Sequence, residues 1–156
     1  EVKMMLVKNY DFKVSYSRSQ TIKGFINGIK VDFIRFDYPH LFPCDNIENI
    51  RIESIPDIIA MKLLSITDNG SRIKDFIDIA FLSSRYSLND MLNFYLKKIP
   101  NSNALMPLKA LTYFEDIDFK ESVVMLNHAF DWTEISARLM DMANSPNKIF
   151  PEPFST

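Results

Sequence analysis

The pattern of hydrophobic and polar residues changes its character once along the chain, near residue 50. Before that point, short runs rich in β-branched and aromatic residues predict strands at residues 12–17, 21–26 and 29–37. Asn27-Gly28 separates the last two runs and tolerates the positive φ angles of a two-residue turn, so these runs are predicted to pair antiparallel. Two prolines within residues 38–46 predict a loop that ends the sheet.

After residue 50 the apolar residues recur at helical spacing. Ser54 followed by Pro56 and Asp57 is a helix start signal, because the serine oxygen can accept from a free backbone amide and a proline has no amide to lose. Ser87 followed by Asp90 is a second such signal. The predicted helices cover residues 55–67, 72–84, from Ser87 to just before Pro100, 103–115 and 133–144.

These elements predict an α+β fold in which a small antiparallel sheet is followed by a C-terminal helical bundle. We expect the sheet in residues 1–50, the bundle packed on it in residues 51–145, and a tail in residues 146–156, all in one compact unit.

The composition fits a globular domain and gives no support to several other classes of protein. The chain has 156 residues, of which 47% are hydrophobic, and this is enough for one core. A net charge of only −2 gives no support to nucleic-acid binding through bulk charge. No apolar run approaches the roughly 18 residues of a membrane span, and residues 1–10 are too charged for a signal peptide. We therefore expect a cytoplasmic protein of a bacterium-like cell with no membrane partner.

Lys62 is the least expected residue of the first predicted helix. At about 100° per residue it falls within a stripe of isoleucines that should face the core. A lysine there must either extend its ammonium group to solvent or meet an anion. The next helix follows a short break and carries Asp75 and Asp78 one turn apart, so the lysine and the two carboxylates are close enough to meet. Alternatively, the two aspartates form local pairs with Arg72 and Lys74 on a solvent face.

Other polar residues carry weaker signals. Asp32 stands in a largely apolar predicted strand, where an exposed position is more common than a role as a ligand. His40 and His128 have no metal-ligand partner at short spacing, so neither a zinc site nor a catalytic histidine is predicted. For Cys44, the single cysteine, the sequence likewise predicts neither a metal-binding nor a catalytic role.

The succession of motifs along the chain resembles a known family. Residues 57–62 read D-I-x-A-M-K, and residues 72–78 read R-x-K-D-F-x-D. With residues 30–39, 86–92 and 108–118, they resemble the C-terminal two-thirds of the AbiEii-type abortive-infection nucleotidyltransferases, over about residues 10–142. These are toxins of type IV toxin–antitoxin systems with a DNA-polymerase-β-like catalytic fold. The resemblance implies nucleotide transfer from a nucleoside triphosphate to tRNA or a protein acceptor, and an antitoxin partner in phage defence.

The resemblance also implies roles for individual residues. Asp32 matches the third acidic residue of the catalytic sheet, which helps to hold Mg²⁺ or to activate the attacking hydroxyl. Lys62 matches a lysine that contacts the nucleotide phosphates. The acidic motif on the next helix is matched by Asp75 and Asp78, with Arg72 and Lys74 as nucleotide-binding neighbours.

One part of the family pattern has no counterpart in these residues. The family places a Gly-Ser turn and an Asp-x-Asp pair on the strands that bind the metal, whereas Gly70-Ser71 here precedes a predicted helix. We therefore expect residues 1–9 to be the end of the helix that follows those strands, and the chain to be a truncated form with little or no transferase activity.

Two alternatives stay open at this point. The chain is either a non-catalytic helical module that docks an antitoxin or another partner, or an orphan domain in which Lys62 and the carboxylates form only structural ion pairs. An unpaired sheet edge also favours self-association into a homodimer.

Overall fold

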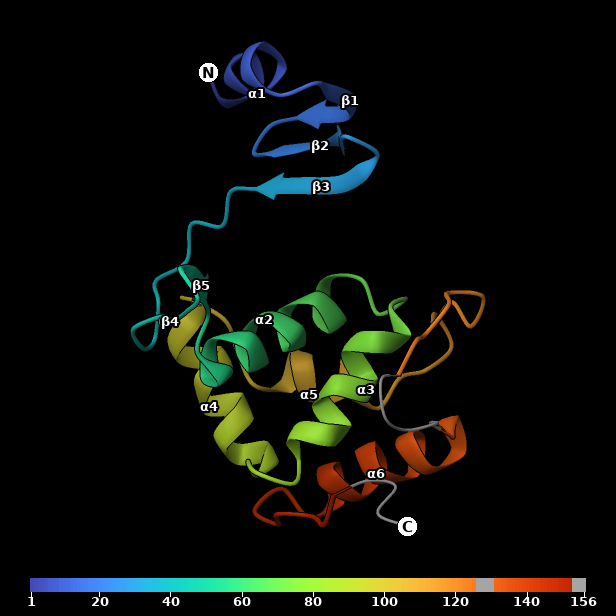
Figure 1. Ribbon diagram of the computed structural model, residues 1–156. Helices are drawn as coiled ribbons and strands as arrows, with labels where there is room; N and C mark the ends of the chain where they lie inside the picture. The colour runs from blue at the N-terminus through green and yellow to red at the C-terminus, as the bar shows by residue number, and fades with distance from the viewer. Residues whose placement is uncertain (126–130, 153–156) are drawn as a thin grey trace. The chain divides into compact units, whose positions relative to one another are not determined.

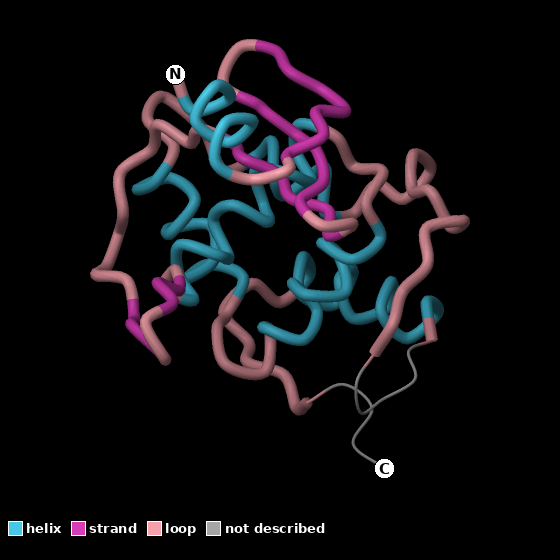
Figure 2. The backbone as a smooth tube through the Cα atoms, turned by 45° about the horizontal axis from the view of Figure 1, so that its top comes forward, coloured by secondary structure: helices cyan, strands magenta, loops and turns pink. Residues whose placement is uncertain are grey.

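The computed structural model describes residues 1–125 and 131–152, and it confirms the predicted α+β class (Figure 1). The structure divides into two units, Glu1–Tyr38 and Pro39–Thr156. The longer strands precede residue 38 and most of the helices follow it; strands are magenta and helices cyan in Figure 2.

The first unit consists of α1 (Val2–Asn9) and a three-stranded antiparallel sheet of β1 (Phe12–Arg18), β2 (Thr21–Ile26) and β3 (Ile29–Ile34), in that order. The predicted hairpin is confirmed, since Ile26 pairs with Ile29 across a turn in which Asn27 and Gly28 have φ angles of 50° and 79°. β3 ends at Ile34 and not at residue 37. Its last pair is Thr21 with Ile34, so the following residues have no strand residue opposite them.

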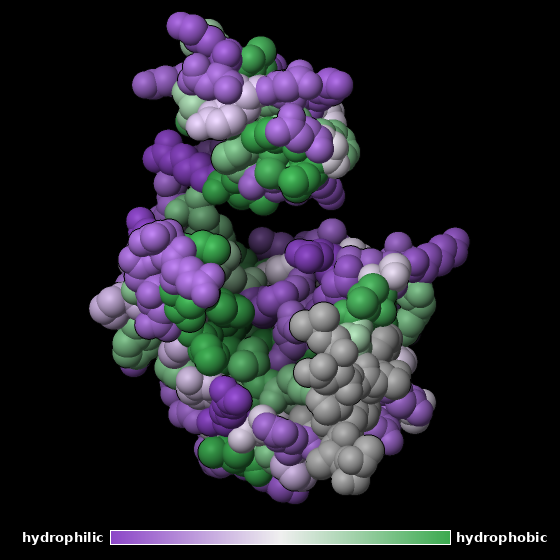
Figure 3. All heavy atoms as spheres, in the orientation of Figure 1, coloured by the Kyte–Doolittle hydropathy of each residue, from purple (hydrophilic) through white to green (hydrophobic). Residues whose placement is uncertain are grey.

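The first unit buries few apolar side chains. Leu6 and Phe12 are its buried hydrophobic residues among those described, whereas Phe25, Ile29 and Ile34 are exposed. Hydrophobic and hydrophilic residues therefore lie side by side on its surface (Figure 3).

The second unit begins with a short hairpin that the sequence analysis did not predict. β4 (Asp45–Ile47) pairs antiparallel with β5 (Ile50–Ile52), where a loop was expected up to residue 46. Its turn, Glu48-Asn49, has φ angles of 51° and 65°. Strands of three residues carry too little periodicity to be recognised, and Glu48 is an uncommon residue at positive φ.

Five helices follow the hairpin in the described part of the second unit: α2 (Ile55–Asp68), α3 (Ile73–Leu82), α4 (Leu88–Lys98), α5 (Leu105–Leu111) and α6 (Trp132–Asn144). The two predicted start signals are confirmed, because Ser54 caps α2 and Ser87 forms a capping box with Asp90 on α4. The helix predicted at residues 103–115 is shorter, ending at Leu111. The chain beyond α5 turns away, and the amide of Asp118 donates to the carbonyl oxygen of Ser71.

The helices pack around a hydrophobic core. α2 contributes Ile59, Leu63 and Ile66, and the other helices surround them with further fully buried side chains: Phe76, Ile79, Leu88, Met91, Leu111, Ile135, Leu139 and Met142. Beside Phe76, the rings of Phe114 and Trp132 pack edge to face, with centroids 5.4 Å apart. No helix in residues 1–125 or 131–152 has the length and apolar character needed to cross a membrane.

A buried ion pair joins the start of α2 to the end of α4. Lys98 Nζ lies 2.5 Å from Asp57 Oδ1, and both side chains are almost completely inaccessible to solvent. Asp57 also accepts from Ser54 Oγ at 2.5 Å, and from the amides of Leu41 and Phe42 at 2.9 and 3.2 Å. Lys98 Nζ donates in addition to the carbonyl oxygen of Pro39, at 3.0 Å. The pair therefore fastens the loop at residues 39–42 to two helices.

These contacts lower the pKa of Asp57. Burial by itself raises the pKa, but the hydrogen bonds from Lys98, Ser54 and the two loop amides outweigh it and hold the pKa at about 2. Because an unfolded aspartate has a pKa of about 3.9, the ionised Asp57 stabilises the fold fully above about pH 5, and this contribution is lost as the pH falls toward 2.

We predict that Asp57→Asn lowers the free energy of unfolding by about 3–5 kcal/mol near pH 7, because it leaves the Lys98 ammonium buried without its anion. The difference from the wild type should shrink as the pH falls toward 2, since the wild-type carboxyl then becomes neutral too. Urea unfolding over this pH range measures both effects.

Asp68→Asn is the matched control, because Asp68 is an exposed carboxylate at the other end of the same helix. We expect it to change the free energy of unfolding by no more than about 0.5 kcal/mol. An Asp57→Asn cost that stays constant down to pH 2 would contradict the assignment.

Candidate functional site

Lys62 meets both predicted carboxylates. Its Nζ lies 2.7 Å from Asp75 Oδ1 and 2.6 Å from Asp78 Oδ2. The short connection between α2 and α3 places the two helices beside each other, and both contribute buried residues, such as Leu63 and Phe76, to the same core. Lys62 is therefore neither a solvent-extended side chain nor an unpaired cation.

The two carboxylates differ in their surroundings. The side chain of Asp75 is 2% exposed, and its second oxygen accepts from Ser65 Oγ at 2.7 Å. The side chain of Asp78 is 48% exposed. Asp75 thus fastens α3 to α2, while Asp78 holds the ammonium of Lys62 from the solvent side.

The two carboxylates also determine the charge state of Lys62. Partial burial lowers its pKa, but the hydrogen bonds and charges of Asp75 and Asp78 outweigh burial and raise the pKa above that of an ordinary lysine. Lys62 is therefore a fixed cation at neutral pH. It can attract an anion, but it cannot serve as a general base.

Two further cations lie beside this group. Arg72 Nη1 is 3.7 Å from Asp75 Oδ2, whereas Lys74 Nζ pairs with Glu121 at 3.0 Å and not with Asp78 as the local alternative requires. With Lys62, they line a shallow pocket of about 190 Å³, together with Asp78 and the apolar residues Ile77, Val123, Val124 and Met125. Three cations and an apolar wall suit an anionic group attached to an apolar one.

Asp32 lies in the other unit, on β3. It is paired with Lys23 of β2 in the sheet register, and its Oδ2 is 3.7 Å from Lys23 Nζ. Mg²⁺ prefers several oxygen ligands in octahedral geometry. In the described part of the chain, neither Asp32 nor the carboxylates beside Lys62 belong to a group of three or more side chains able to hold a metal ion. These residues by themselves do not fit the Mg²⁺ that the resemblance implies.

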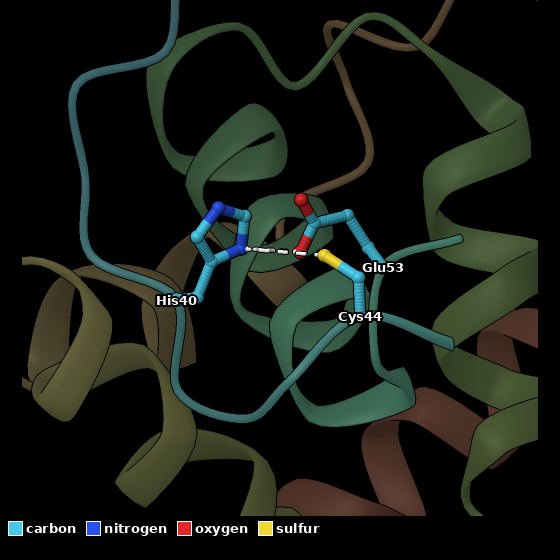
Figure 4. A group of neighbouring side chains, drawn as sticks. All are labelled: His40, Cys44 and Glu53. Carbon is cyan, nitrogen blue, oxygen red and sulfur yellow. Dashed lines mark hydrogen bonds and ion pairs between the residues drawn. The ribbon is translucent and has the colours of Figure 1, made fainter. Parts of the chain in front are cut away.

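The structure brings together one group to which the sequence analysis assigned no role: His40, Cys44 and Glu53 (Figure 4). Cys44 is four positions from His40, so the expectation that His40 has no potential metal-ligand partner at short spacing is not met, and Glu53 joins the two only through the unpredicted β4–β5 hairpin. The second histidine, His128, lies outside the described residues.

Fold and site together define an α+β protein with a small antiparallel sheet and a lysine held by two carboxylates between core helices. Residues 15–151 match the family model described as nucleotidyl transferase AbiEii toxin, type IV TA system. The chain therefore belongs to the AbiEii nucleotidyltransferase toxin family, and the resemblance seen in the sequence is confirmed. Comparisons with curated proteins and with solved structures gave no match.

We predict that the two carboxylates beside Lys62 contribute unequally to stability. Asp75→Asn should lower the free energy of unfolding by about 1–3 kcal/mol, because it weakens a buried charged hydrogen bond to Lys62. Asp78→Asn should cost about 1 kcal/mol or less, since its side chain is half exposed. Urea unfolding of the two variants measures both losses in the free energy of unfolding. Equal losses would show that Asp75 does not fasten the helices.

Proposed function

We propose that this chain carries the phosphate-contacting helical part of a nucleotidyltransferase-like toxin, with Lys62 contacting the phosphates of a nucleoside triphosphate. The observation that supports this proposal is the position of the Lys62 ammonium, held between Asp75 and Asp78 at the edge of a pocket that also contains Arg72 and Lys74. Lysine binds phosphate as a point charge, and the planar guanidinium of an arginine can add a two-pronged contact.

The charge balance of the pocket indicates how phosphate would enter. The cations Lys62, Arg72 and Lys74 are balanced by three carboxylates, those of Asp75, Asp78 and Glu121. A phosphate that replaces one of the carboxylates as a partner of Lys62 keeps this charge balance. Asp78 is the one that can leave, because its side chain already faces solvent, whereas buried Asp75 would keep the ammonium in place.

Transfer of the nucleotide requires more than this pocket. In two-metal phosphoryl chemistry, carboxylates hold the ions that stabilise the attacking and leaving oxygens. Asp32, the candidate for that role, is paired with Lys23 and belongs to no group of three or more potential metal-ligand side chains among the described residues. We propose that the residues present here do not catalyse transfer by themselves to either acceptor, tRNA or protein.

We predict no transfer of label when the chain is incubated with Mg²⁺, labelled nucleoside triphosphates and total tRNA. The physical reason is that Asp32 alone cannot hold the catalytic metal. Gel analysis of the RNA and of the protein bands measures incorporation, with Asp32→Asn as the background sample. Robust labelling that Asp32→Asn abolishes would overturn this part of the proposal.

We predict that Lys62→Met weakens binding of a labelled nucleoside triphosphate at least about tenfold, which corresponds to about 1.4 kcal/mol. Asp78→Asn should strengthen binding, because it removes the anion that competes with phosphate for the ammonium. Equilibrium binding without metal measures the phosphate contact separately from transfer.

Lys97→Met is the control, since Lys97 is an exposed lysine on α4 that does not line the pocket. Equal affinities of Lys62→Met and Lys97→Met would argue against the phosphate contact.

A non-catalytic module that docks an antitoxin is the second candidate function. It is favoured by Leu105, Met106 and Tyr113, apolar side chains on α5 and just after it that are 48–63% exposed.

If Lys62→Met is neutral or stabilising and changes no ligand binding, the ion pairs are structural. Capture of the neighbouring gene product by the chain would then support the docking function.

A further inference from the structure

The group of His40, Cys44 and Glu53 lies in the second unit, outside the pocket of Lys62. Figure 4 shows the three side chains converging from the loop before β4 and from the end of the β4–β5 hairpin. His40 Nδ1 is 3.0 Å from Glu53 Oε2 and 3.8 Å from Cys44 Sγ. One potential ligand atom from each residue lies within 4.8 Å of the others.

We propose that His40, Cys44 and Glu53 bind a zinc-class divalent transition metal ion. A nitrogen, a sulfur and a carboxylate oxygen form a ligand set that Zn²⁺ accepts and that Mg²⁺ does not favour. Tetrahedral ligands at the usual Zn²⁺ distances of about 2.0–2.3 Å are separated from one another by about 3.3–3.8 Å. The separations of His40 Nδ1 from Glu53 Oε2 and from Cys44 Sγ, 3.0 and 3.8 Å, are close to this range.

The backbone explains why two of these residues face each other. Asp45 pairs with Ile52 at the open end of the hairpin, so Cys44 and Glu53 are the next opposed positions beyond it. Opposed residues of an antiparallel pair place their side chains on the same face. The hairpin thus brings a thiol and a carboxylate together although they are nine positions apart in the sequence.

The buried ion pair explains why His40 is held beside them. Lys98 Nζ donates to the carbonyl oxygen of Pro39, and Asp57 accepts from the amides of Leu41 and Phe42. The residues before and after His40 are therefore anchored to the core, so the imidazole is positioned before any metal binds. A ligand set positioned in advance loses less conformational entropy on binding.

On metal binding, each of the three side chains exchanges its present contact for a bond to the metal. The His40–Glu53 hydrogen bond is replaced by one bond from each residue to the metal, and the thiol of Cys44 binds as thiolate, so protons pass to solvent. Arg51 Nη2, which donates to Cys44 Sγ at 3.7 Å, is exposed and can turn into water. Three protein ligands leave a fourth position for water or an added ligand. A pocket of about 590 Å³, lined in part by His40 and Cys44, provides room for it.

Titration of the whole chain with Co²⁺ tests the site, because a thiolate ligand gives Co²⁺ a charge-transfer absorption band that oxygen and nitrogen ligands do not give. We expect one Co²⁺ per chain with this band, and its displacement by Zn²⁺ but not by Mg²⁺. Cys44→Ser should abolish the band. His40→Gln and Glu53→Gln should weaken binding at least about tenfold, since even the outer partners of metal ligands contribute that much.

Glu48→Gln is the matched control, because Glu48 is an exposed carboxylate at the turn of the same hairpin and is not part of the group. It should bind Co²⁺ like the wild type. A wild type without the band, a Cys44→Ser variant that retains it, or an equal loss in Glu48→Gln and Glu53→Gln would overturn the proposal.

A second measurement needs no variant. Cys44 is the single cysteine of the chain, so its alkylation by iodoacetamide reports on this position alone. Zn²⁺ should slow alkylation several-fold, and Mg²⁺ at the same concentration should leave it unchanged. Equal rates with and without Zn²⁺ would also overturn the proposal.

Discussion

The buried pair of Asp57 and Lys98 is the interaction on which the second unit most depends. Removing two charges from water costs several kcal/mol per ion, and the attraction between them offsets this cost only when the remaining hydrogen-bonding groups are also satisfied. Asp57 meets this condition with four donors, two of which are amides of the preceding loop. A hydrophobic pair of the same volume would fill the space, but it would not fix the path of that loop.

The helix α2 carries two charged side chains that form ion pairs on different sides of the helix. Asp57 and Lys62 are five residues apart, which places them about 140° apart around the helix axis. Asp57 is directed to α4 and the loop at residues 39–42, and Lys62 is directed to α3. On the same helix, Ile59 and Leu63 are fully buried. The rotation of this one helix therefore determines the surroundings of both candidate sites in the second unit.

Local signals were sufficient for much of the fold. Asn27-Gly28 and the two serine caps were predicted correctly because each depends on a few neighbouring residues. The contact between Lys62 and the two aspartates was one of two arrangements that the sequence left open, because a short connection limits how two helices can pack. Lys98 was missed: it reads as an ordinary basic residue at the end of a helix, and its partner is 41 positions away. The grouping of Glu53 with His40 and Cys44 was not predicted either, because Glu53 reaches them through a hairpin too short to recognise.

The edge-to-face contact of Trp132 with Phe114 makes the two units separately observable. Trp132 is the single tryptophan of the chain, and its ring also packs against Phe76 of α3 and against Phe119. Its fluorescence therefore reports on the packing of α6 in the second unit, while the first unit emits no tryptophan signal of its own. The sheet of the first unit is visible instead in the far-ultraviolet circular dichroism of the whole chain. Comparing the two signals during unfolding distinguishes one cooperative protein from two independently melting parts.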